Sequence, residues 1–133
     1  MERRIKSINQ LPLPELRGSR GETYRGSLDP GIEDLVRVLT GLGYITQGSC
    51  EGHLDERKFP FPWVTILGLG AHRIRGLEGR IGLFNQQSDI KWTTISALKP
   101  RLPASDEKEL YSLHQSAQLL AEFIFEGYLK SPQ

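Results

Sequence analysis

The fold is decided by residues 29–53, DPGIEDLVRVLTGLGYITQGSCEGH, which read as a helix, a strand and a polar cluster in that order. Asp29 can cap the free N–H groups of a helix, and Pro30 fits the first helical position because its missing N–H would be unpaired there. Glycines stop the helix, and residues 44–47 follow as a short strand. Apolar side chains recur at helical spacing and predict one buried stripe, formed by Ile32, Leu35, Val36, Leu39 and Leu42.

The rest of the chain continues this alternation of helices with strands. Residues 63–67 give the strongest strand signal because they are β-branched and mostly apolar, and residues 90–98 predict a third strand. Residues 73–86 favour a helix that glycines weaken, and Ser105 is the expected cap of a long final helix. We therefore predict an α/β fold, with α+β as the alternative. A small sheet of three to four strands is covered by helices, among them the long C-terminal helix.

Length and composition indicate one domain. The chain has 133 residues, of which 38% are apolar, so it can bury a core without metals or disulfides. Residues 1–28 are rich in proline, glycine and arginine, and we predict an irregular basic arm before a single α/β domain over 29–133. The single cysteine cannot form an internal disulfide. No apolar run reaches the roughly 18 residues of a membrane span. We expect a cytoplasmic protein without membrane association.

Chemistry concentrates in the segment Ser49-Cys50-Glu51-Gly52-His53, directly after a predicted strand. Binding and catalytic groups are frequent at such strand-to-loop junctions. In a catalytic interpretation, Cys50 is the nucleophile, His53 lowers the pKa of its thiol, and Glu51 orients the ring or acts as a base. In the simpler interpretation, the cysteine is a packed thiol that lines a pocket.

A zinc site is the second interpretation of the same residues. Cys50 and His53 form a C-x-x-H pair, and His72 after the next strand is a candidate third ligand. Three protein ligands and a water would make a catalytic zinc centre, which predicts a zinc-dependent hydrolase. This interpretation requires His72 to reach the same end of the sheet as Cys50.

The third interpretation is a binding site without unusual chemistry. Ser49, Gly52 and successive backbone N–H groups at a strand end can cradle an anion or the edge of a nucleotide. We expect Trp63 and Trp92 in the core, although Trp92 is also a candidate stacking platform for a base. We place His114, in the final helix, outside the site. Cationic partners for the ligand would come from His53, Arg57, Lys58, His72 and Arg73.

Four short motifs within residues 25–52 carry a family resemblance: Gly26-Ser27-Leu28-Asp29, Leu35-Val36, Tyr44-Ile45-Thr46 and Ser49-Cys50-Glu51-Gly52. In these motifs the chain resembles the tRNA wybutosine-synthesising methyltransferases. The resemblance implies a small α/β domain that acts on a modified guanosine in tRNA with S-adenosylmethionine as methyl donor. Ser49, Cys50 and His72 are the positions that it carries over as site residues.

Together these patterns predict a nucleotide- or RNA-binding protein of the tRNA-modification kind, with its pocket around residues 49–53. The net charge of +1 neither favours nor excludes such a partner. Two alternatives stay open, a non-enzymatic interaction module and a zinc-dependent hydrolase. The residues leave open whether the protein is an enzyme.

Overall fold

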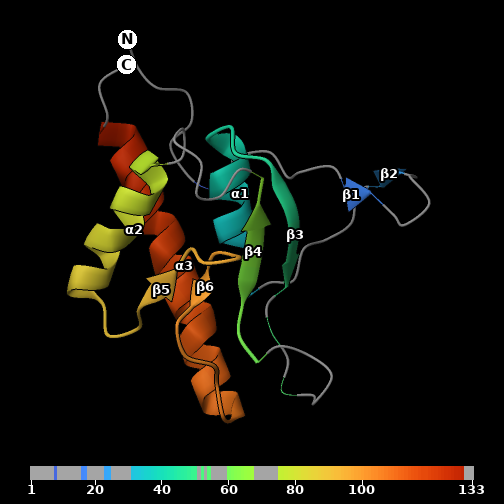
Figure 1. Cartoon of the computed structure of the whole chain (residues 1–133), viewed down its shortest axis with the longest axis vertical. Coiled ribbons are helices and arrows are strands. Elements are labelled where there is room, and N and C mark those ends of the chain that lie inside the picture. Colours follow the sequence, from blue (N-terminus) through green and yellow to red (C-terminus); the bar gives the residue numbers. More distant parts are fainter. Residues whose placement is uncertain are drawn as a thin grey trace.

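Three helices and three antiparallel pairs of short strands make up the described part of the chain (Figure 1). The computed structural model describes residues 8, 16–17, 23–24, 31–50, 52, 54, 60–67 and 75–130. The helices are α1 (Glu33–Gly41), α2 (Arg75–Gln87) and α3 (Glu107–Lys130). The strands are β1 (Leu16–Arg17), β2 (Thr23–Tyr24), β3 (Thr46–Cys50), β4 (Trp63–Ile66), β5 (Trp92–Thr93) and β6 (Lys99–Pro100).

The pairs β3–β4 and β5–β6 are joined into one layer by a single bridge between Val64 and Leu98. These two residues exchange both backbone hydrogen bonds, with N–O distances of 3.0 and 2.8 Å. The strands therefore lie side by side in the order β3, β4, β6, β5. Continuing the antiparallel register places Pro62 opposite Pro100. Neither proline has an N–H to donate, so strand pairing ends there.

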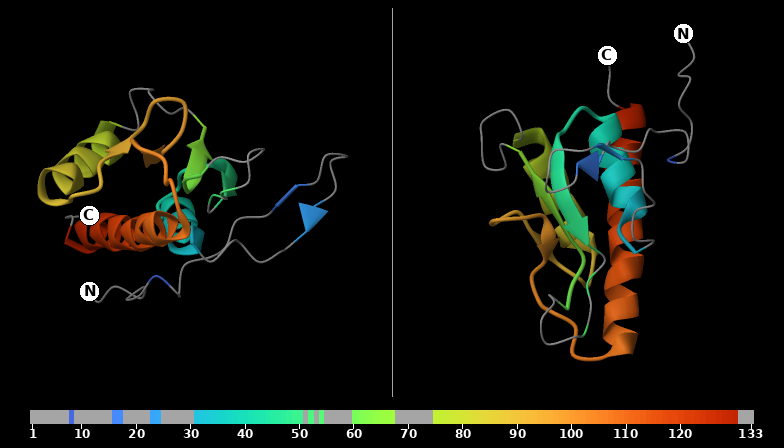
Figure 2. Two further views of the ribbon diagram at one scale, coloured as in Figure 1. Left: turned by 90° about the horizontal axis from the view of Figure 1, so that it is seen from below. Right: turned by 90° about the vertical axis from the view of Figure 1, so that its right-hand side faces the viewer.

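One face of this layer packs against the helices. Figure 2 shows α1 and α3 together on one side of the strands, with α2 beside α3 and close to β5. The inward apolar side chains of the layer are almost fully buried and join the apolar stripes of all three helices in one core, among them Val64, Trp92 and Leu98. Burial also raises the pKa of the Tyr44 phenol, because desolvation disfavours its charged form.

No described helix has both the length and the apolar composition to cross a membrane.

Trp92 connects three elements at the β5 edge of the layer. Its backbone N–H donates to Oδ1 of Asn85 (2.8 Å), and Nδ2 of Asn85 donates to its carbonyl oxygen (2.9 Å). The amide of Asn85, in the last turn of α2, thus takes the place of a neighbouring strand. The indole N–H donates to Oγ of Ser116 in α3 (2.9 Å), and the ring is buried. The edge strand is therefore closed by a side chain instead of a further strand.

Helices α2 and α3 are held together by Arg80. Its Nη2 donates to the carbonyl oxygen of Phe123 (2.9 Å), and its guanidinium lies 4.1 Å from the centroid of that ring. A side chain on Gly127 would meet this guanidinium, since an added Cβ would lie 2.3 Å from Nε. An alanine at this position would therefore require the Arg80 guanidinium to move away from its present place.

The predicted fold class is confirmed, namely a mixed α and β fold with a small sheet and a long C-terminal helix. All described strand pairs are antiparallel, which is the α+β form of the prediction. Two predicted helix starts and one predicted strand differ from the structure. Helix α1 has Ile32 and not Asp29 at its N-cap, and α3 is capped by Asp106, one residue after Ser105. The predicted third strand, residues 90–98, is a hairpin arm and its turn, because Ser96 adopts a φ of 69°.

We predict that Asn85→Ala costs about 2–4 kcal/mol in the free energy of unfolding, because it leaves two part-buried backbone groups of Trp92 without partners. Chemical denaturation with fluorescence detection measures this loss. Gln86→Ala is the matched control, since Gln86 is the exposed neighbour in the same helical turn, and its effect should stay below about 0.5 kcal/mol. Equal effects of the two changes would show that Asn85 does not secure the edge strand.

Candidate functional site

The end of β3 brings part of the predicted cluster onto the sheet itself. Cys50 lies opposite Trp63, and Ser49 lies opposite Val64 in the β3–β4 pair. Directly opposed residues in an antiparallel pair point to the same face, and successive residues alternate. Val64 is buried in the core, so Ser49 points toward the helices. Cys50 and Trp63 therefore point to the opposite face, away from the helices.

We call this second side of the sheet the outer face. The Val64–Leu98 bridge places Lys99 of β6 opposite Trp63, and Thr93 of β5 lies opposite Lys99. The Lys99 ammonium lies 5.5 Å from the ring centroid of Phe61, two residues before Trp63, which places this phenyl ring on the same face. All members of the outer face are half-buried: Gly48, Cys50, Phe61, Trp63, Thr65, Thr93 and Lys99.

A glycine in β3 gives the Trp63 indole its place on this face. An added Cβ on Gly48 would lie 3.5 Å from the indole, which is ordinary van der Waals contact, so the ring packs over the strand backbone there. Thr65 donates its hydroxyl to the carbonyl oxygen of Gly48 (3.2 Å) on the same side. A residue much larger than alanine at position 48 would displace the ring. The indole is thus held by its neighbours while part of it stays accessible.

The turn after β3 requires glycine at position 52. Gly52 is buried and has a φ of 92°, a backbone conformation that L side chains rarely adopt. An added Cβ would lie 2.5 Å from the carbonyl carbon of Phe61, so side chain and backbone cannot both fit. The N–H of Gly52 donates to Sγ of Cys50 (3.4 Å). This turn therefore fixes the position of the Cys50 thiol beside the aromatic pair, by which we mean Phe61 and Trp63. It also gives the sulfur a hydrogen-bond donor.

The remaining predicted site residues lie outside the described residues: Glu51, His53, Arg57, His72 and Arg73. The strand arrangement still bears on the predicted zinc centre. Because β3 and β4 are antiparallel, the end of β4 lies beside Thr46 at the start of β3, and not beside Cys50. Among the residues that the structure describes, no three His, Cys, Asp or Glu side chains gather closely enough to hold a metal ion.

The predictions from sequence for the two tryptophans have different outcomes. Trp92 is in the core, as predicted, and is only 1% exposed. Trp63, also predicted in the core, is half-buried at the outer face. Its position in a strong strand signal gave no indication of which face it occupies. The alternation of buried Val64 and Ile66 identifies that face only once the helices are known to cover one side.

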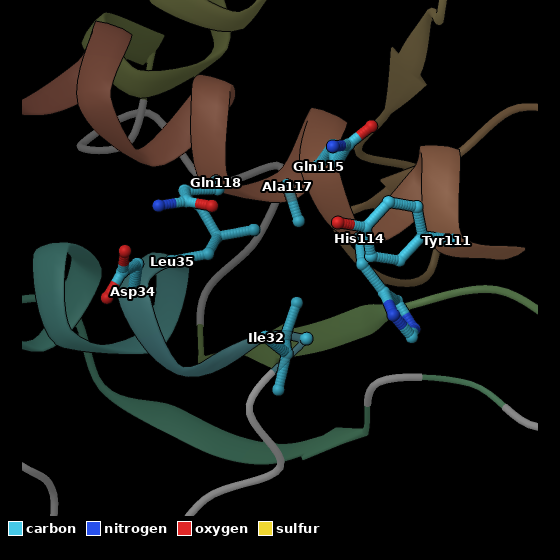
Figure 3. A pocket seen from close by; sticks show the side chains of 9 residues that line it. Ile32, Asp34, Leu35, Tyr111, His114, Gln115, Ala117 and Gln118 are labelled. Atoms are coloured by element: carbon cyan, nitrogen blue, oxygen red, sulfur yellow. The ribbon is translucent and has the colours of Figure 1, made fainter.

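A separate hollow of about 320 Å³ lies between the start of α1 and the first half of α3 (Figure 3). Its apolar floor includes Ile32 and Leu35, and Figure 3 shows the Asp34 carboxylate and the Gln118 amide on one side of it. His114, which we expected outside the site around residues 49–53, lines this hollow with its ring against Gly31, where an added Cβ would lie 2.7 Å away. In the sequence, the spacing of polar residues at 111, 114 and 118 was the feature that could have indicated one shared face of α3.

No protein-family model, no curated protein and no solved structure matches the chain. The resemblance to the wybutosine-synthesising methyltransferases therefore stays a prediction from the short motifs alone.

We predict that Gly52→Ala destabilises the protein far more than Gly43→Ala. Both glycines have a positive φ, 92° and 94°, so both changes carry a conformational cost of about 1 kcal/mol. Only Gly52 lies against the backbone of Phe61, whereas an added Cβ on Gly43 meets nothing within 4 Å. We expect an additional loss of at least about 2 kcal/mol for Gly52→Ala in urea denaturation. Similar losses for both variants would contradict the tight turn beside Cys50.

Proposed function

We propose that this protein binds a nucleotide or an RNA at the outer face of its sheet, next to the segment of residues 49–52. The observation that carries the proposal is the row Cys50, Trp63, Lys99 across three neighbouring strands. It combines a half-buried aromatic ring with an adjacent ammonium group. Aromatic rings stack on bases of any sequence, and cations beside them attract phosphate.

The placement of Phe61 adds support to a ligand of this kind. The Lys99 ammonium lies over the Phe61 ring, and the strand register places Lys99 opposite Trp63. A base on either ring would bring its phosphate close to this ammonium. The predicted cationic residues of the two flanking segments, among them Arg57 and Arg73, would add to the attraction for phosphate. In this proposal Cys50 contributes a wall of the site and a reaction is not required.

The tRNA-modification hypothesis is the finer form of this proposal. A methyl transfer would need a donor such as S-adenosylmethionine, and a cysteine-based reaction would also need Glu51 and His53. The resemblance in Ser49-Cys50-Glu51-Gly52 motivates testing that donor together with RNA. A zinc-dependent hydrolase is the alternative, and metal analysis of the purified protein separates it. Stoichiometric zinc that is lost in His53→Ala and His72→Ala would favour the hydrolase.

We predict that RNA or a nucleotide raises the melting temperature in a thermal-shift panel that also contains S-adenosylmethionine and divalent metals. A ligand at ten times its Kd should raise the melting temperature by roughly 3–6 °C, because the ligand binds only the folded state. Trp63→Leu should weaken binding by about 5- to 150-fold, the value of one lost base stack. Tyr111→Leu is the matched control, since Tyr111 is an aromatic residue 62% exposed on α3.

Two results would contradict the proposal. Flat melting curves for every nucleotide and RNA would leave a non-enzymatic interaction module as the better account of the cluster. Equal losses of affinity in Trp63→Leu and Tyr111→Leu would place the binding site away from the outer face. The melting temperature of each variant without ligand must be measured first, so that a loss of folding is not taken for a loss of binding.

A further inference from the structure

The outer face is an extended surface, and its width bears on the kind of nucleic acid that it fits. The row Cys50, Trp63, Lys99, Thr93 crosses β3, β4, β6 and β5. Neighbouring strands lie 4.7–4.9 Å apart, so the row spans roughly 14 Å. Stacked bases of one strand rise roughly 3.4 Å each along the axis of a duplex. The row is therefore longer than one stacked nucleotide and has room for more than one.

The two aromatic residues of this face have the spacing of successive stacking positions. Phe61 lies two residues before Trp63, the first residue of β4, so the two are at most roughly 7 Å apart along the chain. Each ring can receive a different base, and a mononucleotide can occupy only one of them. Bases in a duplex are stacked on each other and are not free for such contacts, whereas unpaired bases are.

The charges on this side of the sheet are complementary to a phosphate backbone. The hairpin from Lys91 to Arg101 contains three cations and no carboxylate, and β3 and β4 contain no carboxylate either. The Lys91 ammonium is directed to the end of α2, where it donates to the carbonyl oxygens of Asn85 and Ser88. Lys99 is beside the aromatic pair, and the exposed Arg101 lies two residues further along the same hairpin.

We infer that the outer face binds an unpaired nucleic-acid strand of several nucleotides, which crosses the sheet from Cys50 toward Thr93 with bases on Phe61 and Trp63 and phosphate at Lys99. This inference rests on the proposed function and narrows its ligand. Ribose and deoxyribose strands share the chemistry used here, which is a stacked base and a phosphate. RNA and DNA arms of the same experiment distinguish the two sources.

Quenching of the intrinsic tryptophan fluorescence tests the inference directly. Of the two tryptophans, Trp92 is buried and Trp63 is the half-buried one, so a stacked base should quench mainly Trp63. We expect the affinity to rise at least about tenfold from a mononucleotide to a single-stranded tetranucleotide, because a second stack and further phosphate contacts are added. A hairpin duplex of the same composition should bind at least about tenfold more weakly than the single strand.

The charge of Lys99 supplies a matched pair of variants. Lys99→Gln should lower the affinity for the tetranucleotide and reduce the slope of log K against log salt by about 0.7, the value of one phosphate contact on a single strand. Lys108→Gln removes an exposed cation at the start of α3 and should change neither quantity.

The outcomes separate this inference from the proposed function. If a mononucleotide quenches Trp63 and binds as tightly as the tetranucleotide, the proposed function stands and the extended strand is wrong. If the duplex binds as well as the single strand, or if Lys99→Gln and Lys108→Gln have equal salt slopes, the inference is likewise overturned. If no nucleotide or oligonucleotide binds, both fall together.

Discussion

The bridge between Val64 and Leu98 is the interaction on which the rest of the sheet depends. It joins two strand pairs that are otherwise separate ladders, with two backbone hydrogen bonds between residues that are both 0% exposed. Side chains alternate along a strand, so a slip of one residue would place Lys99 in the core and Leu98 in solvent. The burial of an unpaired ammonium makes that slip unfavourable. The register of this bridge therefore determines which residues share the outer face.

The boundaries of the outer face are also set by simple chemical constraints. Pro62 and Pro100 end the pairing of β4 with β6, because neither residue can donate a hydrogen bond. Asn85 closes the free edge of β5 with its amide. Gly52 turns the chain away from the end of β3 in a conformation that few other residues adopt. These features leave a row of half-buried side chains across the strands, which is the basis of the proposed binding function.

Much of the fold follows from the sequence, and particular residues show where prediction ends. The apolar stripe of α1 and the β-branched run of β4 identified their elements because burial is periodic. The predicted strand over residues 90–98 was wrong because the chain turns at Ser96, which has a positive φ. Serine seldom adopts a positive φ, so the sequence did not indicate this turn. The predicted strand before Cys50 was placed too early, since β3 takes its limits from pairing with β4.

The segment proposed as the site could be predicted from the sequence, whereas its neighbours in the structure could not. The cluster at 49–53 was visible because it contains the only cysteine beside a glycine and a histidine. Its relation to Trp63 and Lys99 was not visible, because it depends on two strand pairings between distant segments of the chain. The contact of His114 with Gly31 was not predicted for the same reason, because it joins α3 to the segment before α1. Local sequence patterns show which side chains could bind or react. The pairing of distant strands determines which of these side chains lie close together.

The central claim is that a nucleotide or an RNA binds at the outer face. The two indole N–H signals in a nitrogen–proton NMR spectrum test this claim most directly. Titration with a short single-stranded RNA should shift the Trp63 indole signal. The Trp92 signal should stay in place, because its N–H is buried and donates to Ser116. If saturating RNA moves neither indole signal, or shifts only signals from α1 and α3 such as those of Gln118 and Tyr111, the outer face is not the binding surface.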